Sequence, residues 1–132
     1  MLEHLSNEYV LLCKGVADPE DLSVAYENIA NANNRLERHK AALTAAESCI
    51  RTYYANPGCH IEKSDALIAM GRKSEAWKSL EISERLARHA LEGAKERLNN
   101  AKSDFDRKEA ATYIRLYESQ LNEIESIRSL IK

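Results

Sequence analysis

Bulky hydrophobic residues recur every seven positions between residues 22 and 54, and a second row, offset by three, holds mostly small residues. The bulky row is Leu22, Ile29, Leu36, Leu43 and Ile50, and the second row is Ala25, Ala32, His39, Ala46 and Tyr53. A seven-residue repeat is typical of a helix that packs along one seam against another helix. The pattern predicts one helix from Leu22 to Tyr54, roughly 50 Å long, whose alanines let a second helix approach closely.

A less regular seam follows between residues 70 and 105. One row is Met70, Trp77, Glu84, Leu91, Leu98 and Phe105, and the other is Lys73, Leu80, Ala87, Ala94 and Ala101. The segment NNAKSDFDRKE predicts a break, because Ser103 or Asp104 can cap a new helix there. The last segment presents Ala110, Ile114, Tyr117, Leu121, Ile124 and Ile131 on one face, which Arg128 interrupts.

Few residues punctuate these segments, since the chain has only four glycines and two prolines. The stretch KGVADPEDL predicts the end of a short N-terminal helix near Lys14 and a new helix with Asp18 as N-cap and Pro19 at its first position. NPG at residues 56–58 marks the next boundary. Strand-like alternation is absent. We therefore predict one all-α domain, residues 1–132, with a short N-terminal helix and two or three long antiparallel amphipathic helices, bundle-like or coiled-coil-like.

A second interpretation starts from an internal repeat. NNRLERHKAALTAAESCI and IAMGRKSEAWKSLEISE align with Ala42 and Ala76 in register, 34 residues apart. In the second unit, Gly71 stands at a turn, and Leu80 and Ser83 follow at packing positions. Over residues 22–88 this pattern resembles the tetratricopeptide repeat, a helix–turn–helix unit of about 34 residues. The resemblance implies a stack of short helical hairpins that forms a groove for peptides or proteins and is not an enzyme.

The two interpretations differ at the run NIANANN, residues 28–34. In the repeat, this run leads into a turn, with Glu37 where the family has glycine, and the long helix is split. In the bundle, the helix continues through it. Four asparagines in seven residues cost roughly a few tenths of a kcal/mol each relative to alanine, and five heptads of seam outweigh that cost. We therefore predict the continuous helix and keep the hairpins as the alternative.

Two similar pentapeptides, RLERH at residues 35–39 and RLARH at 85–89, suggest a duplicated binding site. On a continuous helix, Arg35, Arg38 and His39 share one side. His39 falls in the alanine row, however, whereas His89 lies off its seam, so the two copies have different structural roles. We interpret the arginines as salt-bridging flanks. The alternative function, a nucleic-acid-associated helical protein, would use Arg35, Arg38, Arg85 and Arg88, but no aromatic residues interleave with them as stacking platforms.

Motifs for catalysis, cofactors or metals are missing. The sequence contains no GxxxxGK[ST], GxGxxG or GxSxG motif. Cys59 and His60 are adjacent, and sequence neighbours rarely ligate one ion without a CxxC or HxxxH partner. We predict that the protein is not an enzyme and holds no cofactor or metal. The cysteines, Cys13, Cys49 and Cys59, are odd in number and irregular in spacing, which predicts no disulfide framework and a reducing compartment.

The balance of charge gives the protein no overall attraction to nucleic acid or anionic membranes, because 19 basic residues face 21 acidic ones for a net charge of −2. The sequence shows no signal peptide and no membrane-spanning run, so we expect a cytoplasmic protein. We predict a small adaptor, assembly chaperone or inhibitor that binds another protein through a helical face or groove, or forms a homodimer. The candidate partner-binding residues are Ala25, Ala32, Leu36, His39, Ala46 and Trp77.

Overall fold

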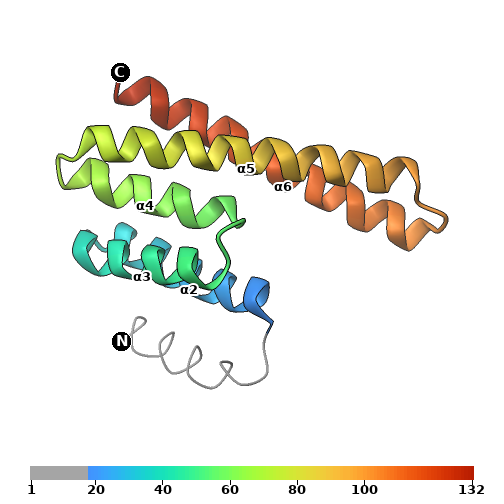
Figure 1. Ribbon diagram of the computed structural model, residues 1–132, viewed down its shortest axis with the longest axis horizontal. Helices are drawn as coiled ribbons and strands as arrows, with labels where there is room; N and C mark the ends of the chain where they lie inside the picture. Colours follow the sequence, from blue (N-terminus) through green and yellow to red (C-terminus); the bar gives the residue numbers. More distant parts are fainter. Residues whose placement is uncertain (1–17) are drawn as a thin grey trace.

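The computed structural model describes residues 18–132, and this part of the chain folds into five helices with short connections (Figure 1). The helices are α2 (Pro19–Arg35), α3 (His39–Thr52), α4 (Pro57–Ala69), α5 (Lys73–Asn99) and α6 (Asp104–Leu130). The predicted all-α fold class is confirmed. The short N-terminal helix expected to end near Lys14 lies outside the described residues.

Each helix packs against the next one in the chain, because the connections are only long enough to reverse its direction. In addition, α2 contacts α4, and α4 contacts α6. Figure 1 shows that α4 lies between α3 and α5, and that α5 and α6 run on together past the ends of the shorter helices. The first helices of successive hairpins are therefore neighbours.

The predicted continuous helix from Leu22 to Tyr54 is wrong, because α2 ends at Arg35 and α3 begins three residues after Leu36. Glu37 adopts φ +60° in this turn. The amide of Arg38 donates to the carbonyl of Asn33 over 2.8 Å, which closes the end of α2 in the way that a left-handed residue allows. Glycine usually takes this position because a side chain is disfavoured there, so Glu37 gave no turn signal.

The split lets the two halves of the seam pack against each other. A buried cluster between α2 and α3 contains Ala25, Ile29, Ala30, Ala45 and Ala46, with Leu22 and Tyr26 packed against it. The small residues permit the close approach that the alanine row predicts, but the partner helix is the other half of the same segment. The hydrophobic burial gained when the two halves pack on each other stabilises the fold more than an unbroken seven-residue seam would.

A second turn repeats this geometry 34 residues later in the sequence, between α4 and α5. Gly71 has φ +78° there, and the amide of Arg72 donates to the carbonyl of Leu67 over 2.8 Å. The hydrogen bond from Arg38 to Asn33 has the same length and pattern. The two hairpins thus share a turn at the spacing on which the repeat interpretation rests. Membership of the tetratricopeptide family stays a prediction.

The predicted helix starts are confirmed where they depend on local capping. Asp18 accepts a hydrogen bond from the amide of Asp21 over 2.8 Å, with Pro19 in the first turn of α2. The break before the last helix falls where expected, and the Ser103 hydroxyl accepts from the amide of Asp106 over 3.1 Å. In the NPG boundary, the Asn56 side chain caps α4.

Two charges that interrupt the predicted seams are partners in the structure. A guanidinium nitrogen of Arg128 on α6 lies 3.3 Å from a carboxylate oxygen of Glu84 on α5. The same guanidinium sits 5.2 Å from the ring centre of Trp77. The hydrogen bond from Arg128 is the main cause of the lowered pKa of Glu84. This pair joins α5 to α6, so it helps to fix α6 against α5.

We expect Arg128→Met to lower the free energy of unfolding by about 1–2 kcal/mol, because Glu84 would lose its better-shielded partner. The matched control is Arg88→Met, since Arg88 also pairs with Glu84 but keeps 66% of its side chain exposed, against 17% for Arg128. We expect that control to change stability by less than about 0.5 kcal/mol. Urea unfolding of both variants measures this difference, and equal losses would show that the α5–α6 contact does not depend on the pair.

Candidate functional site

Carboxylates from three helices gather on one side of the structure. Glu27 comes from α2, Glu62 and Asp65 from α4, and Glu123 from α6, and we call this set the acidic face. Glu62 and Glu123 each raise the pKa of both Glu27 and Asp65, which reflects their proximity. Between described residues, no ion pair involves any of the four. Their charges are therefore compensated by no described cation.

Glu62 is the buried centre of the acidic face, with 6% of its surface exposed. The side-chain amide of Asn31 donates to one of its oxygens over 3.0 Å, and that of Asn34 donates to the other over 3.1 Å. Asn34 also donates to the backbone carbonyl of Glu62 over 3.1 Å. Neutral donors thus satisfy this carboxylate and join α2 to α4 without cancelling its charge. Two of the asparagines in the run NIANANN therefore hold the helices together.

Asp65 is the most perturbed group of the acidic face. Burial, together with the charges of Glu62 and Glu123, raises the pKa of its carboxyl to about 7. Burial also raises the pKa of the more exposed Glu123, again helped by Glu62. Each negative charge here makes ionisation of the neighbouring carboxyl groups less favourable. The carboxylates of the acidic face therefore bind protons more readily than an isolated, exposed carboxylate does.

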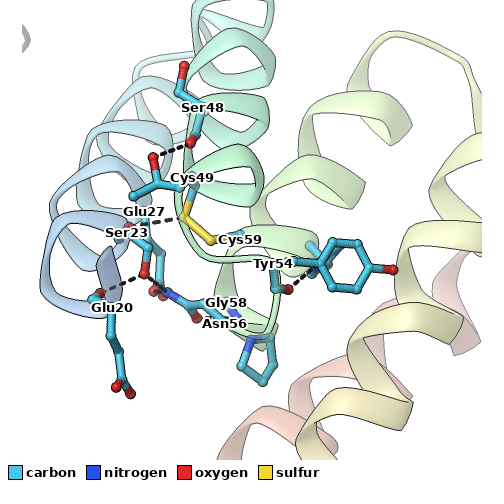
Figure 2. The surroundings of a disulfide bond; sticks show 12 residues. Glu20, Ser23, Glu27, Ser48, Cys49, Tyr54, Asn56, Gly58 and Cys59 are labelled. Atoms are coloured by element: carbon cyan, nitrogen blue, oxygen red, sulfur yellow. Dashed lines mark hydrogen bonds between the residues drawn. A yellow bond between two sulfur atoms is a disulfide. The ribbon is translucent and has the colours of Figure 1, made fainter. Parts of the chain in front are cut away.

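Glu27 is held at the start of α4. The Asn56 side chain donates to a carboxylate oxygen of Glu27 over 3.0 Å and accepts from the amide of Gly58 over 2.9 Å (Figure 2). A Cβ atom at Gly58 would overlap the Glu27 carboxylate, so glycine is needed for this close approach. Burial raises the pKa of Glu27 more than the hydrogen bond from Asn56 lowers it. The position of this charge is therefore set by the turn that leads into α4.

A disulfide lies beside this turn and joins Cys49 in the last part of α3 to Cys59 in the first turn of α4 (Figure 2). Both cysteines are fully buried, and their Cα atoms are 5.6 Å apart. The sequence predicted no disulfide framework, and the bond between these two cysteines corrects that prediction. The α3–α4 connection reverses the chain and brings the two helix ends together, which cysteine spacing could not show. Cys13 lies outside the described residues.

The six predicted partner-binding residues lie in several different parts of the structure. Ala25 and Ala46 are buried between α2 and α3, Leu36 is 52% exposed in the turn, and Ala32 and His39 are half-buried. Trp77 lies half-buried on α5, a helix that contacts neither α2 nor α3. The structure therefore does not bring the six together, and their contact with a partner stays a prediction.

The two RLxRH segments occupy different settings. Arg35 ends α2 and His39 begins α3, so the expectation that Arg35, Arg38 and His39 share one side of a continuous helix is wrong. The second copy lies within α5, where Arg88 pairs with Glu84 at 3.1 Å. The interpretation that the copies have different structural roles is confirmed, since one spans a turn and the other lies inside a helix.

The adjacent Cys59 and His60 are both engaged in the first part of α4. Cys59 belongs to the disulfide, and a ring nitrogen of His60 lies 2.9 Å from the carbonyl oxygen of Tyr54. Burial lowers the pKa of His60, which favours its neutral form. Within residues 18–132, no three His, Cys, Asp or Glu side chains are placed to hold a metal ion.

No protein-family model, no curated protein and no solved structure matches this chain. Of the helices that the structure describes, none is both long and apolar enough to cross a membrane. The cytoplasmic location stays a prediction.

The acidic face was missed at the sequence level because its members come from separate segments. One signal could have found part of it. The 34-residue alignment places Asn28 opposite Glu62, and Asn31 opposite Asp65. These pairs occupy equivalent positions of successive hairpins and so lie on the same side of the stack. In addition, α2 contains no lysine or arginine before Arg35.

Proposed function

We propose that this protein is a non-enzymatic interaction module that binds a lysine- or arginine-rich segment of another protein against the acidic face. The observation that carries the proposal is the gathering of carboxylates from α2, α4 and α6 with no described cation among them. Like charges held together in a partly buried setting destabilise the folded chain. A bound cation would relieve that repulsion, so the free energy lost in folding would be recovered in binding.

The arrangement of the helices supports a binding module. Because α2 contacts α4 and α4 contacts α6, these three helices are neighbours in the packed structure. The resemblance to tetratricopeptide repeats implies a groove for a peptide or protein, and the repeated turn geometry at Glu37 and Gly71 agrees with that resemblance. Adaptor, assembly chaperone and inhibitor are the roles that such a surface would serve.

The nucleic-acid hypothesis receives less support. Its two arginine pairs lie on α5 and at the α2–α3 turn, and α5 contacts neither α2 nor α3. Arg88 also pairs with Glu84, which offsets its charge. The two arginine pairs therefore come from elements that do not pack against each other. Salt-dependent retention on DNA or RNA remains the measurement that would favour this alternative.

Binding can be tested with a fluorescein-labelled peptide of alternating lysine and alanine, and with a glutamate analogue as the negative probe. We expect the Asp65→Asn, Glu123→Gln double variant to bind the cationic peptide about tenfold more weakly, as the loss of two close charge contacts implies. Fluorescence polarisation at pH 8 measures the affinity.

The matched control is the Glu118→Gln, Glu125→Gln double variant, which removes the same charge from exposed positions on α6. We expect this control to bind the cationic peptide as the parent does. Equal weakening of both double variants would show that only net charge matters, and no binding of the cationic peptide would refute the proposed function. Sedimentation of the same samples tests the homodimer alternative.

A further inference from the structure

We propose that the bond between Cys49 and Cys59 is a reversible latch, whose redox state sets how firmly the first turn of α4 is held against α2 and α3. The bond spans 10 positions of sequence, across the turn that joins α3 to α4. A cross-link over so short a loop constrains the chain locally. The α5–α6 hairpin carries no cysteine and is not cross-linked. Opening the latch should therefore loosen one junction and leave the rest folded.

The latch lies beside Ser23 of α2. The Cys49 sulfur lies 3.0 Å from the backbone carbonyl oxygen of Ser23, and the Asn56 side chain donates to the Ser23 hydroxyl over 3.1 Å (Figure 2). The same Asn56 amide donates to Glu27. The residues that position the Glu27 carboxylate are thus next to the cross-link. Where the latch affects ligand binding, the inference rests on the proposed function of the acidic face.

The buried site is suited to both redox states. In the reduced state, the Cys49 thiol can donate a hydrogen bond to the carbonyl oxygen of Ser23, which already lies beside the sulfur. The thiol is therefore not left without a partner in the buried site. Neither sulfur can be attacked in the closed structure, because both cysteines are fully buried. Exchange therefore requires the α3–α4 turn to open, which makes switching slow in the folded protein.

The oxidant that we name is a small disulfide such as glutathione disulfide. One cysteine thiolate attacks it, which forms a mixed disulfide and releases one glutathione thiolate. The second cysteine thiolate then attacks the protein sulfur of the mixed disulfide and releases the other glutathione. Two protein thiols are oxidised to one disulfide, one glutathione disulfide is reduced to two thiols, and the two protons pass from the cysteines to glutathione. A dithiol reductant reverses the sequence.

The latch can be tested on the full chain in glutathione buffers of graded potential. Iodoacetamide trapping and mass spectrometry identify which cysteines are bonded, and Cys13→Ala in all samples leaves one possible pair. We expect a single two-electron transition between Cys49 and Cys59. Upon reduction, we expect amide hydrogen exchange in residues 53–62 to become at least about tenfold faster, while exchange in the distal α5–α6 hairpin stays unchanged.

The Cys49→Ala, Cys59→Ala variant is the matched control and should exchange like the reduced protein in every buffer. The inference is overturned if no bond forms in oxidising buffer, or if the oxidised and reduced proteins exchange equally in residues 53–62. Complete unfolding upon reduction would also overturn it, because the bond would then be a structural requirement.

The cationic peptide adds a separate readout, in which we expect several-fold tighter binding to the oxidised form. Hydrogen exchange needs no ligand, so a protein that latches but binds no peptide refutes only the proposed function. Equal peptide affinity in both redox states would overturn the link between the latch and the acidic face.

Discussion

Replacing Ala46 with leucine should lower the free energy of unfolding by about 2–3 kcal/mol, near the upper end of what overpacking a core position costs. Ala46 on α3 is fully buried, as is Ala30 on the facing helix α2. Leucine would insert three more carbon atoms between two helices that approach closely because their contact residues are small. Urea unfolding followed by circular dichroism measures the loss.

The matched control is Ala69→Leu, because Ala69 is exposed at the end of α4. We expect this variant to stay within about 0.5 kcal/mol of the parent. If the alanine row formed a seam between two chains, Ala46→Leu would instead change the sedimentation coefficient while the stability of each chain survived. A variant unchanged in both measurements would place Ala46 in solvent and contradict the α2–α3 contact.

The helix starts could be predicted because they depend on a few neighbouring residues. Asp18 and Ser103 each bind an amide three positions ahead, so their role is written in the local sequence. The turn at Glu37 could not be predicted in the same way. Its left-handed conformation is carried by a residue other than glycine and is stabilised by packing of α2 on α3, a contact that exists only after the segment has folded back.

The functional features depend on contacts between distant segments even more strongly. Glu84 and Arg128 each read as a defect in a separate seam, and only the α5–α6 hairpin shows that the two defects compensate one another. Cys49 and Cys59 likewise show no recognisable spacing, and the turn between α3 and α4 brings them together. Hydrophobic periodicity was therefore enough to predict the helical class. Which polar residues pair could be predicted only from the order in which the helices pack.

The stability of the protein should depend on pH through Asp65. Its pKa is about 7 in the folded protein, above its ordinary value of 3.8. Between about pH 4 and pH 7, the Asp65 carboxyl is protonated in the folded chain but ionised in the unfolded chain. The free energy of unfolding therefore falls as pH rises through this range. The full shift corresponds to about 4 kcal/mol, but Asp65 is only half-buried, so we expect solvent to reduce its effect to about 1–3 kcal/mol.

Asp65→Asn should accordingly stabilise the protein by about 1–3 kcal/mol at pH 8 and change it little at pH 4, where the carboxyl is already neutral. Comparison with the parent at each pH isolates this contribution from that of His60. Burial lowers the pKa of His60, which makes the protein less stable as pH falls below about 6.5, the opposite direction. Urea unfolding at pH 4, 6 and 8 measures both proteins.

Glu125→Gln removes an exposed carboxylate from α6 and serves as the control, with no expected pH-dependent gain. A gain from Asp65→Asn that was the same at every pH would trace to packing or hydrogen bonding instead of charge. A loss at pH 8 would mean that the ionised carboxylate is stabilised in the folded protein and that the acidic face is not electrostatically strained. The proposed attraction of a basic segment would then lose its physical basis, because relief of that repulsion is what a bound cation supplies.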